Sequence, residues 1–475
     1  MDTLDTADLY DYRTAAQPAV SPSGDRVAYV VEEFDPEEDV FDTWATSSLT
    51  PLINAGWSHD PAADPDDPAA VGTPPVDAPA DGAYTLDNAE LYPFDLRPQG
   101  HDIISFWLFH TVVKCVEHTG EVPFDAVLIN GHVLDENRKK MSSSKGNVVL
   151  PETVMDDYPV DAIRYWAASS AVGDDFPFKT NELTQGEKLI RKVWNASKLV
   201  DSLAPADPEE PTDLAPIDRW LLATVDDLVE RLTDLLDDNA FARARDELRS
   251  TFWHTFCDDY LEIAKQRLRD GEDPSAAYAL TTAHRTFVGL FAPLLPHVTE
   301  EVYQARYVDL DGNVESLHLT AWPAPRGHEA DLDAGETALA VIGALRKYKS
   351  ERQLPLNADL AHVAVYGDVE GFESAIRETM HVDDLELLAE PPEITERVAA
   401  VDLDYSTLGP KYGGKVGEFD AAIDADDYEI TDDGLRVAGE TLVPDAFEIE
   451  RERTYEGEGK GEIVETDDAV IVVHD

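Results

Sequence analysis

Apolar residues recur with two different periods along this chain of 475 residues. From Gln185 onward they return every three to four residues, which places them on one face of a helix. The first of these positions are Leu189, Ile190, Val193, Trp194 and Val200. The same spacing predicts three further long helices, over residues 217–236, 240–269 and 276–305. An all-helical domain is therefore expected in the middle of the chain.

Shorter apolar runs ahead of this region predict strands that alternate with helices. Strands are expected at residues 92–96 and 127–129, and the run from Ile103 to Val116 predicts a largely buried helix between them. Asp102 is a good N-cap for that helix, and Pro151 suits the first turn of a later one. Alternation of this kind is typical of an α/β domain.

The two ends of the chain differ from this pattern. After residue 330, one helix (337–350) and short strands such as 362–366 predict a small α+β region. Residues 1–38 contain a Pro/Gly turn and a strand candidate at 26–31, and they resemble the opening strands of the β-propeller in acylaminoacyl-peptidase-like serine peptidases. No blade repeat and no Gly-x-Ser-x-Gly elbow is found downstream, so a serine peptidase remnant is a remote alternative.

Acidic residues dominate the composition. The chain has 37 Lys and Arg against 98 Asp and Glu, a formal net charge of −61, while 43% of its residues are hydrophobic. Such a chain can fold, but it repels itself in dilute buffer. Molar salt relieves this repulsion because it shortens the Debye length to ~3 Å. The composition thus predicts adaptation to a salt-rich, halophile-like cytoplasm, and the lack of a basic face does not exclude RNA as a partner.

The cysteines and the N-terminus exclude several classes of protein. Cys115 and Cys257 are far apart and form no CxxC pair, so no zinc ribbon, disulfide framework or other metal site is expected. Met1 is followed by Asp-Thr-Leu-Asp, unlike the start of a signal peptide. No apolar run reaches the ~18 residues that cross a bilayer. We expect a cytoplasmic protein that does not contact membranes.

A Lys/Ser-rich turn from Arg138 to Asn147, here called the Lys/Ser loop, is the most informative stretch. It resembles the KMSKS signature of class I aminoacyl-tRNA synthetases, in the form KMSSSKGN. The resemblance implies that Lys140 and Lys145 are catalytic and stabilise charge on the β- and γ-phosphates of ATP. The family has Lys where this chain has Ser143, and Lys145 is expected to supply that charge. The implied ATP site consists of Gly131, His132, Lys140, Met141, Ser142, Ser143, Ser144 and Lys145.

For two parts of this region a simpler interpretation stays open. His132 could equally be a surface residue at a strand end. Arg138 and Lys139, beside the signature, are interpreted as solvated turn residues.

A second set of residues indicates which amino acid would be the substrate. Residues 39–52 resemble the DVxDTWxxSSxxPL stretch of valyl-tRNA synthetases, and residues 100–107 resemble the helix that lines their amino-acid slot. Bulky aromatic rings leave room for a short branched side chain, and a carboxylate can pair with an α-ammonium group. The resemblance implies an L-valine pocket formed by Trp44, Asp102, Ile103 and Trp107. Without it, a helix cap and core residues would be the simpler interpretation.

RNA contacts are expected from the helical region and from a basic segment on its C-terminal side. Residues 256–262 and 295–303 resemble the anticodon-binding bundle of the valyl, isoleucyl and leucyl enzymes. The densest basic cluster of the chain lies just beyond, with a tyrosine among its cations. Its candidate tRNA-binding residues are Arg346, Lys347, Lys349 and Arg352. A solvated helix end explains this cluster equally well.

The resemblance covers only the C-terminal part of the family pattern, since no His-x-Gly-His tetrapeptide and no inserted editing domain is found. It implies an α/β remnant of a class I nucleotide-binding (Rossmann-like) fold, an all-α anticodon-binding bundle and a small α+β C-terminal region. With the unrelated N-terminal segment, the expected parts are residues 1–38, 39–180, 181–330 and 331–475.

The function implied by the resemblance is that of a truncated valine–tRNA ligase. Its expected partners are tRNA(Val), L-valine and ATP, with Mg²⁺ as part of the substrate complex. A separate polypeptide that carries the missing catalytic half is a candidate partner, and activation by this chain alone is expected to be severely impaired. The alternative is a tRNA-binding module without catalysis.

Overall fold

The computed structural model describes residues 43–59, 84–270, 273–310, 314–389, 394–431, 434–455 and 461–474, together with two short strands near the N-terminus, β1 (Ala19–Val20) and β2 (Val27–Ala28). These two strands pair antiparallel, and the rest of the strand expected at residues 26–31 lies outside the described residues. The chain divides into two compact units, which are described separately. The first comprises Met1–Ile190 and Asp234–Asp246, and the second comprises Arg191–Thr233 and Glu247–Asp475.

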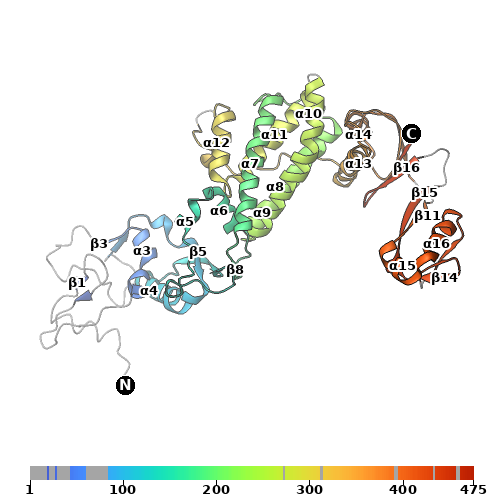
Figure 1. Ribbon diagram of the computed structural model, residues 1–475. Coiled ribbons are helices and arrows are strands. Elements are labelled where there is room, and N and C mark those ends of the chain that lie inside the picture. The colour runs from blue at the N-terminus through green and yellow to red at the C-terminus, as the bar shows by residue number, and fades with distance from the viewer. Residues whose placement is uncertain are drawn as a thin grey trace. The chain divides into compact units, whose positions relative to one another are not determined.

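A β–α–β segment is the main feature of the first unit (Figure 1). Strands β5 (Phe94–Gly100) and β6 (Phe124–Asn130) run parallel, with Phe94 opposite Phe124 and Gly100 opposite Asn130. Both predicted strands are thus confirmed, the first shifted toward its C-terminal end. The helical connection has three parts, a 3₁₀ turn η3 (His101–Ile103), a π-helical turn η4 (Ile104–Leu108) and α4 (Phe109–Thr119).

Two predictions for this connection are wrong. Asp102 is not an N-cap, because Gly100 precedes the first turn and no side chain caps it. The run from Ile103 to Val116 is also not largely buried, since Phe106 is 55% exposed and Phe109 61% exposed. Among the residues that the structure describes, β5 and β6 pair only with each other, so the apolar helix has too small a sheet to cover it.

The rest of the first unit consists of short elements. Helices α2 (Thr43–Ser47) and α3 (Thr50–Asn54) precede the antiparallel pair β3 (Trp57–His59) and β4 (Tyr84–Leu86), and a 3₁₀ turn η2 (Ala89–Leu91) comes next. Strand β7 (Val133–Leu134) pairs parallel with β8 (Phe176–Pro177). Between them lie η5 (Ser143–Lys145), α5 (Pro151–Met155) and α6 (Val160–Ala167). Pro151 occupies the first turn of α5, as predicted.

The middle of the chain is helical, as the spacing of its apolar residues predicts. Its helices are α7 (Thr180–Leu203), α8 (Pro216–Asp237), α9 (Phe241–Ser250), the π-helical η6 (Thr251–Tyr260), α10 (Leu261–Asp270), α11 (Pro274–Phe291) and α12 (Pro296–Arg306). The single helix expected over residues 276–305 is in fact two. Pro293 and Pro296 explain the break, because proline lacks the N–H group that would continue the helix.

Buried charge joins the helices of the second unit. The Asp218 carboxylate is fully buried and accepts hydrogen bonds from Tyr260 Oη (2.7 Å), Arg267 Nη1 and Nη2 (2.7 and 2.8 Å) and Ser275 Oγ (2.5 Å). Arg267 also donates to Asp273 (2.8 Å). These residues, here called the Asp218 cluster, connect α8, η6, α10 and α11. Helices α8, α10 and α11 lie together in Figure 1. The buried carboxylate is therefore paired and fully hydrogen-bonded.

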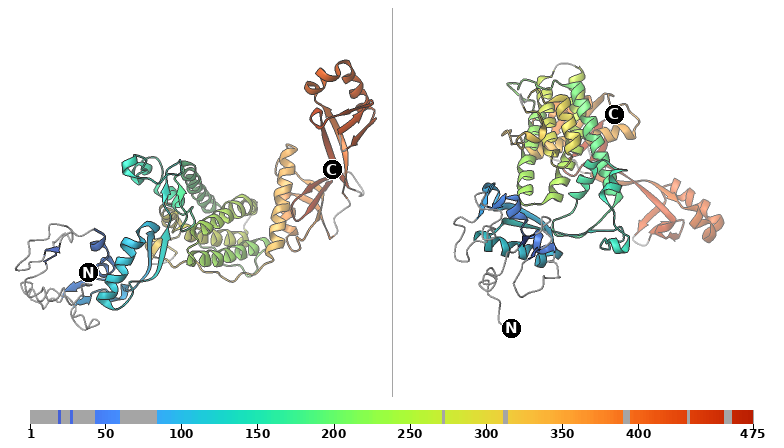
Figure 2. Two further views of the ribbon diagram at one scale, coloured as in Figure 1. Left: turned by 90° about the horizontal axis from the view of Figure 1, so that it is seen from below. Right: turned by 90° about the vertical axis from the view of Figure 1, so that its left-hand side faces the viewer.

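The C-terminal part of the second unit is mixed, as predicted. A short turn η7 (Leu317–Leu319) and helix α13 (Leu332–Glu351) lead to a four-stranded sheet in the order β10-β9-β17-β16. Its strands are β9 (Leu360–Tyr366), β10 (Val382–Leu388), β16 (Gly461–Glu465) and β17 (Val470–His474). Helix α14 (Glu373–Met380) connects the parallel strands β9 and β10, and α13 and α14 pack against this sheet (Figure 2).

A smaller module is inserted between β10 and β16. The long antiparallel pair β11 (Ile394–Leu403) and β15 (Phe447–Tyr455) leads into and out of it. Phe419 and Leu408 fill its own core. Its elements are α15 (Tyr405–Tyr412), η8 (Gly413–Lys415), α16 (Val416–Asp424), β12 (Tyr428–Thr431), β13 (Gly434–Val437), β14 (Glu440–Leu442) and η9 (Pro444–Ala446).

No helix in the described part of the chain combines the length and the hydropathy of a membrane span.

Candidate functional site

The Lys/Ser loop is closed at its base by one carboxylate. Asp135, just after β7, accepts hydrogen bonds from the backbone N–H groups of Asn137 (2.9 Å) and Lys139 (2.8 Å). Its second oxygen accepts from Asn147 Nδ2 (2.8 Å). The Asn147 amide, followed by the backbone donors, lowers the pKa of Asp135. The two ends of the loop are therefore joined through a side-chain pair that no pattern in the sequence indicates.

Two further contacts hold the first half of the loop. Asn147 Oδ1 accepts from the backbone N–H of Ser142 (3.0 Å), and Asn147 Nδ2 reaches the carbonyl of Lys140 (3.3 Å). The Met141 side chain packs against a small core around Val154, Phe178 and Leu183. Met141 thus fixes the loop to the body of the first unit.

The tip of the loop remains accessible. Ser143, Ser144 and Lys145 are exposed and form the 3₁₀ turn η5, which ends at Gly146 with a left-handed φ of 67°. Ser142 Oγ and Ser144 Oγ lie 2.6 Å apart. The tip therefore carries one exposed cation and several hydroxyl groups that can rotate toward an anion.

Lys140, near the start of the loop, contacts two residues from other elements. Its Nζ donates to Asp102 Oδ2 (3.0 Å) and lies 3.3 Å from His132 Nε2. His132 Nε2 is also 3.6 Å from the Asp102 carboxylate, and the His101 ring packs edge-on against the His132 ring at 4.4 Å. The hydrogen bond from Lys140 lowers the pKa of Asp102. These three residues, Lys140, Asp102 and His132, are here called the Lys140 triad.

Close backbone packing positions His132. The preceding Gly131 has no room for a side chain, because a Cβ atom would lie 2.0 Å from the carbonyl oxygen of Asp174. The backbone N–H of His132 donates to Asp175 Oδ1 (2.6 Å). Glycine is thus required at position 131, and His132 is held at the end of β6 facing Asp102 and Lys140.

The two tryptophans predicted to line the amino-acid slot lie together. Their ring centroids are 6.5 Å apart, and Trp107 Nε1 donates to the carbonyl of Ser47 (3.2 Å). Ile103, half-buried on η3, lies next to Asp102 in sequence. The structure thus brings residues predicted for ATP and for the amino acid into one unit, joined at Asp102.

Arg97 is a neighbour of this slot that the sequence interpretation missed. Its guanidinium Cζ lies 3.4 Å from the ring centroid of Trp107 and 4.8 Å from that of Phe124. Both Arg97 and Gln99, two residues later on β5, are buried, and no hydrogen-bond partner reaches Arg97 Nε and Nη2 or the Gln99 amide within the described structure. Burial lowers the pKa of Arg97 to about 10. The alternation Leu-Arg-Pro-Gln was the available signal that these two side chains share one face.

The basic cluster on α13 is largely neutralised. Lys347 is the most exposed member and lies 3.8 Å from Glu351. Arg346 Nη1 donates to the carbonyl of Asp258 (3.3 Å), and Arg352 Nε donates to Glu462 (2.7 Å). Lys347 and Arg352 are exposed and Arg346 is half-buried, and acidic groups compete with RNA for their charge.

Lys349 corrects the prediction for this cluster. It is fully buried, and its Nζ donates to the carbonyls of Leu356 (2.9 Å), Ala358 (2.7 Å) and Met380 (2.7 Å). All three ammonium protons are therefore used inside the protein. Lys349 holds the segment after α13 to the end of α14 and is not accessible to RNA.

Comparisons with known proteins agree with one another. Residues 75–179 match the family model of class I tRNA synthetases (I, L, M and V), and residues 218–365 match the anticodon-binding domain of tRNA ligases. A valine–tRNA ligase of Haloarcula marismortui is 57% identical over 93% of this chain. The chain belongs to the valine–tRNA ligase family. A second member, from Methanothermobacter thermautotrophicus, is 39% identical over 80% of this chain.

The chain spans about half the length of the curated family members it matches, 46% of the Haloarcula protein and 41% of the Methanothermobacter protein. Among solved structures, a ternary LeuRS–tRNA–LeuAMS complex from Agrobacterium radiobacter K84 matches with a TM-score of 0.44 and 18% identity, over 69% of this chain and 37% of that chain. That likeness is too weak to add to the argument. The fold is class I synthetase-like with an anticodon-binding domain, as the family models show.

In the described part of the chain, no group of three or more His, Cys, Asp or Glu side chains is arranged to hold a metal ion. Cys115 and Cys257 are both buried and unbridged, and burial raises their pKa values to about 11 and about 12. Burial therefore disfavours the thiolate form of both side chains.

Proposed function

We propose that this chain carries the amino-acid and ATP half-sites and the tRNA-binding bundle of a valine–tRNA ligase. The reaction is ATP-dependent attachment of L-valine to tRNA(Val). The valine carboxylate attacks the α-phosphate of ATP, pyrophosphate leaves, and the valyl group passes to tRNA with release of AMP. The observation that carries the proposal is the Lys140 triad, in which the Lys/Ser loop meets Asp102, a residue of the implied amino-acid slot.

The geometry supports an exchange of cations at Asp102. Lys140 Nζ donates to Asp102 Oδ2 (3.0 Å), the contact that the α-ammonium group of valine is proposed to make. When polyphosphate binds at the loop, Lys140 turns to it and leaves Asp102 to the amino acid. Lys145 and the hydroxyls of the tip then surround the leaving pyrophosphate, whose growing charge they stabilise.

The remaining members of the two half-sites have roles that suit their positions. Trp44 and Trp107 pack against the valine side chain, with Ile103 beside them. Gly131 and His132 form the adenine and ribose side of the ATP site. The loop residues Met141, Ser142, Ser143 and Ser144 complete that site, with Met141 as its structural anchor. ATP is proposed to bind as its Mg²⁺ complex. The reaction is proposed to take place in the cytoplasm.

The tRNA partner is proposed to bind the helical bundle and the exposed part of the α13 cluster, through Arg346, Lys347 and Arg352. The match of residues 218–365 to an anticodon-binding domain supports this assignment. To bind these cations, tRNA must compete with internal ion pairs such as the one between Arg352 and Glu462.

A separate polypeptide is proposed to complete the catalytic domain. In the described part of the chain, β5 and β6 pair with no further strand, and Phe106 and Phe109 are exposed. Both observations support this view, because parallel sheets are normally covered on both faces. The second candidate is a tRNA-binding module without catalysis, which the match of residues 218–365 to an anticodon-binding domain supports.

ATP–pyrophosphate exchange with L-valine tests the proposal in molar salt. The chain alone is expected to show severely impaired exchange. Addition of a polypeptide that covers the remainder of the Haloarcula marismortui protein is expected to restore it, and Lys140→Ala is expected to abolish the restored activity. Robust exchange by the chain alone would disprove the need for a second polypeptide. Absence of exchange in the mixture, with tRNA binding intact, would favour the non-catalytic module.

A further inference from the structure

The side chain of Arg97 lies between two aromatic rings of the first unit. Its guanidinium Cζ is 3.4 Å from the ring centroid of Trp107, on η4, and 4.8 Å from that of Phe124, on β6. The shorter distance is that of van der Waals contact between stacked planar groups. The guanidinium therefore covers one face of the Trp107 indole, and a ligand can reach the ring only from its remaining surface.

Hydrogen bonding does not explain why Arg97 is buried at this position. Only 5% of the residue is exposed, and no described residue accepts a hydrogen bond from its Nε or Nη2. Burial lowers its pKa to about 10, so that Arg97 remains a cation near neutral pH. An unpaired buried donor lowers the stability of the folded state, whereas a cation over an aromatic face is attracted to it. The contacts with the two rings are thus the main favourable interactions that the described residues offer this side chain.

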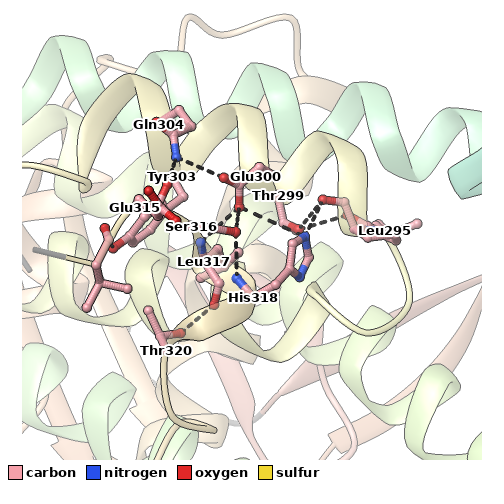
Figure 3. Close-up of polar contacts among 12 residues, drawn as sticks. Leu295, Thr299, Glu300, Tyr303, Gln304, Glu315, Ser316, Leu317, His318 and Thr320 are labelled. Atoms are coloured by element: carbon pink, nitrogen blue, oxygen red, sulfur yellow. Dashed lines mark hydrogen bonds and ion pairs between the residues drawn. The ribbon is translucent and has the colours of Figure 1, made fainter.

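The second unit shows how a charged side chain is more usually accommodated. Glu300 of α12 is half-buried, and Figure 3 shows it at the centre of a hydrogen-bond network. It accepts from Ser316 Oγ (3.1 Å), from the backbone N–H of Leu317 (2.9 Å) and from Gln304 Nε2 (2.8 Å). Arg97 is more deeply buried, yet two of its donors are unpaired among the described residues. Its guanidinium is therefore held by its flat face and not by its donors.

Trp107 is also held at its edge and through its backbone. Its Nε1 donates to the carbonyl of Ser47 at the end of α2 (3.2 Å), and its own carbonyl accepts from Thr111 Oγ1 (2.7 Å). The residue lies on the π-helical turn η4, a rare local geometry that is frequent at functional sites. Together with Arg97, these contacts leave the indole ring little freedom to tilt or to retreat.

A fixed ring matters for the proposed amino-acid slot, which Trp107 lines together with Trp44. L-Isoleucine is longer than L-valine by one methylene group, and an apolar pocket separates such a pair by only ~10–200-fold. An extra methylene group is costly only where the surrounding packing cannot adjust, so the wall of the slot must not yield. A ring that packs on a rigid planar group meets this demand better than a ring that packs on a flexible chain.

We propose that Arg97 is a positioning residue that holds the Trp107 ring in place and thereby limits the length of the amino acid that the slot accepts. The inference rests on the proposed function, and it adds a residue that separates L-valine from L-isoleucine. Arg97 acts through Trp107 and not by contact with the amino acid.

The order of the Trp107 ring tests the first part of this proposal in the full chain, without any substrate. The eight tryptophans are replaced by fluorotryptophan, and Trp107→Phe assigns the Trp107 resonance in the fluorine NMR spectrum in molar salt. Arg97→Met removes the planar cation but keeps an unbranched side chain, and it should broaden or split that resonance because the ring then exchanges between orientations. An unchanged resonance would overturn the positioning role.

Gln99→Met is the matched control for this variant. Gln99 is 4% exposed and has unpaired polar atoms on the same face of β5. Its replacement removes those atoms and leaves Arg97 over the Trp107 ring. The Trp107 resonance should therefore stay as it is in the wild type.

Amino-acid activation tests the second part of the proposal. ATP–pyrophosphate exchange is measured with L-valine, L-isoleucine and L-threonine, in a mixture of the chain with a polypeptide that covers the remainder of the Haloarcula marismortui protein. In Arg97→Met, the ratio of kcat/KM for valine over isoleucine should fall about tenfold. The ratio for valine over threonine, which has the shape of valine, should stay unchanged. Arg97→Lys, which keeps the charge without the flat face, should lie between Arg97→Met and the wild type.

The possible results separate the role of Arg97 from the proposed function. An unchanged ratio for isoleucine in Arg97→Met would overturn the role in selectivity. An equal loss of exchange with all three amino acids would also overturn it, in favour of a purely structural role. Absence of exchange with valine in the wild-type mixture would instead disprove the proposed function, while the fluorine spectrum still decides whether Arg97 positions Trp107.

Discussion

The helical bundle and the β–α–β segment differ in whether their buried polar groups have hydrogen-bond partners. In the bundle, the buried Asp218 carboxylate has four hydrogen bonds from three side chains. On β5, the buried Arg97 and Gln99 keep polar atoms that no described residue pairs, and the adjacent helix exposes large aromatic side chains. Since an unpaired buried polar group is costly, we expect the paired Asp218 to favour the folded bundle and the Arg97 and Gln99 side chains to weaken the β–α–β segment.

The largest expected effect is a loss of stability in the bundle. Asp218→Ala leaves the buried Arg267 guanidinium without its main partner and should lower the free energy of unfolding by about 3–5 kcal/mol. Denaturant unfolding in molar salt, followed by circular dichroism at 222 nm, measures this loss. Asp213→Ala is the control, because Asp213 pairs with Arg219 at the surface and should matter little. Equal stability of the two variants would show that the Asp218 cluster does not hold the bundle together.

A smaller effect comes from a histidine within the same bundle. His284 is buried between Ser197 Oγ (2.8 Å) and Tyr307 Oη (2.6 Å), and burial lowers its pKa to about 3. The unfolded chain binds a proton near pH 6.5 and the folded chain does not, so stability falls as pH drops below about 6.5. From pH 7 to pH 5 this group alone should cost about 2 kcal/mol.

His284→Gln removes the titrating group and should flatten that dependence, although it lowers stability at pH 7. Unfolding midpoints measured at pH 7, 6 and 5 in constant salt compare the slopes of variant and wild type. Identical slopes would mean that the pKa of His284 is the same in the folded and the unfolded chain.

The smallest effect has the opposite sign and probes the β–α–β segment. Arg97→Met removes an unpaired buried cation but keeps an unbranched side chain against Trp107, and it should stabilise the first unit by about 1 kcal/mol. The midpoint of thermal unfolding, followed by tryptophan fluorescence, gives the change. A loss of stability would show that stacking on Trp107 outweighs the cost of burying the guanidinium.

Periodicity predicted the bundle because each helix there covers its apolar face with another helix. The same kind of pattern failed for residues 103–116, since a pattern marks which side chains are apolar and not whether enough sheet is present to cover them. Pro293 and Pro296 indicated the break between α11 and α12. The prediction of a single helix followed the helical spacing of the apolar residues and missed it.

Candidate site residues show the same division. The Lys/Ser loop and the two tryptophans were found through family resemblance, and the structure places both tryptophans together. The pairing of Asp135 with Asn147 depends on how the loop closes, which no local pattern contains. Lys349 was assigned to the surface with its basic neighbours, but it lies four residues after Leu345 and so on the buried face of α13.

The clamp between Asp135 and Asn147 also sets what the loop can do. Asp135 and Asn147 join the two ends, Asn147 also holds the backbone of Ser142, and Met141 is packed, so that only residues 143–146 lie outside these contacts. A short tether loses little chain entropy on ordering. If the loop binds ATP as proposed, we therefore expect its affinity to depend more on its charges than on the conformational entropy lost on binding.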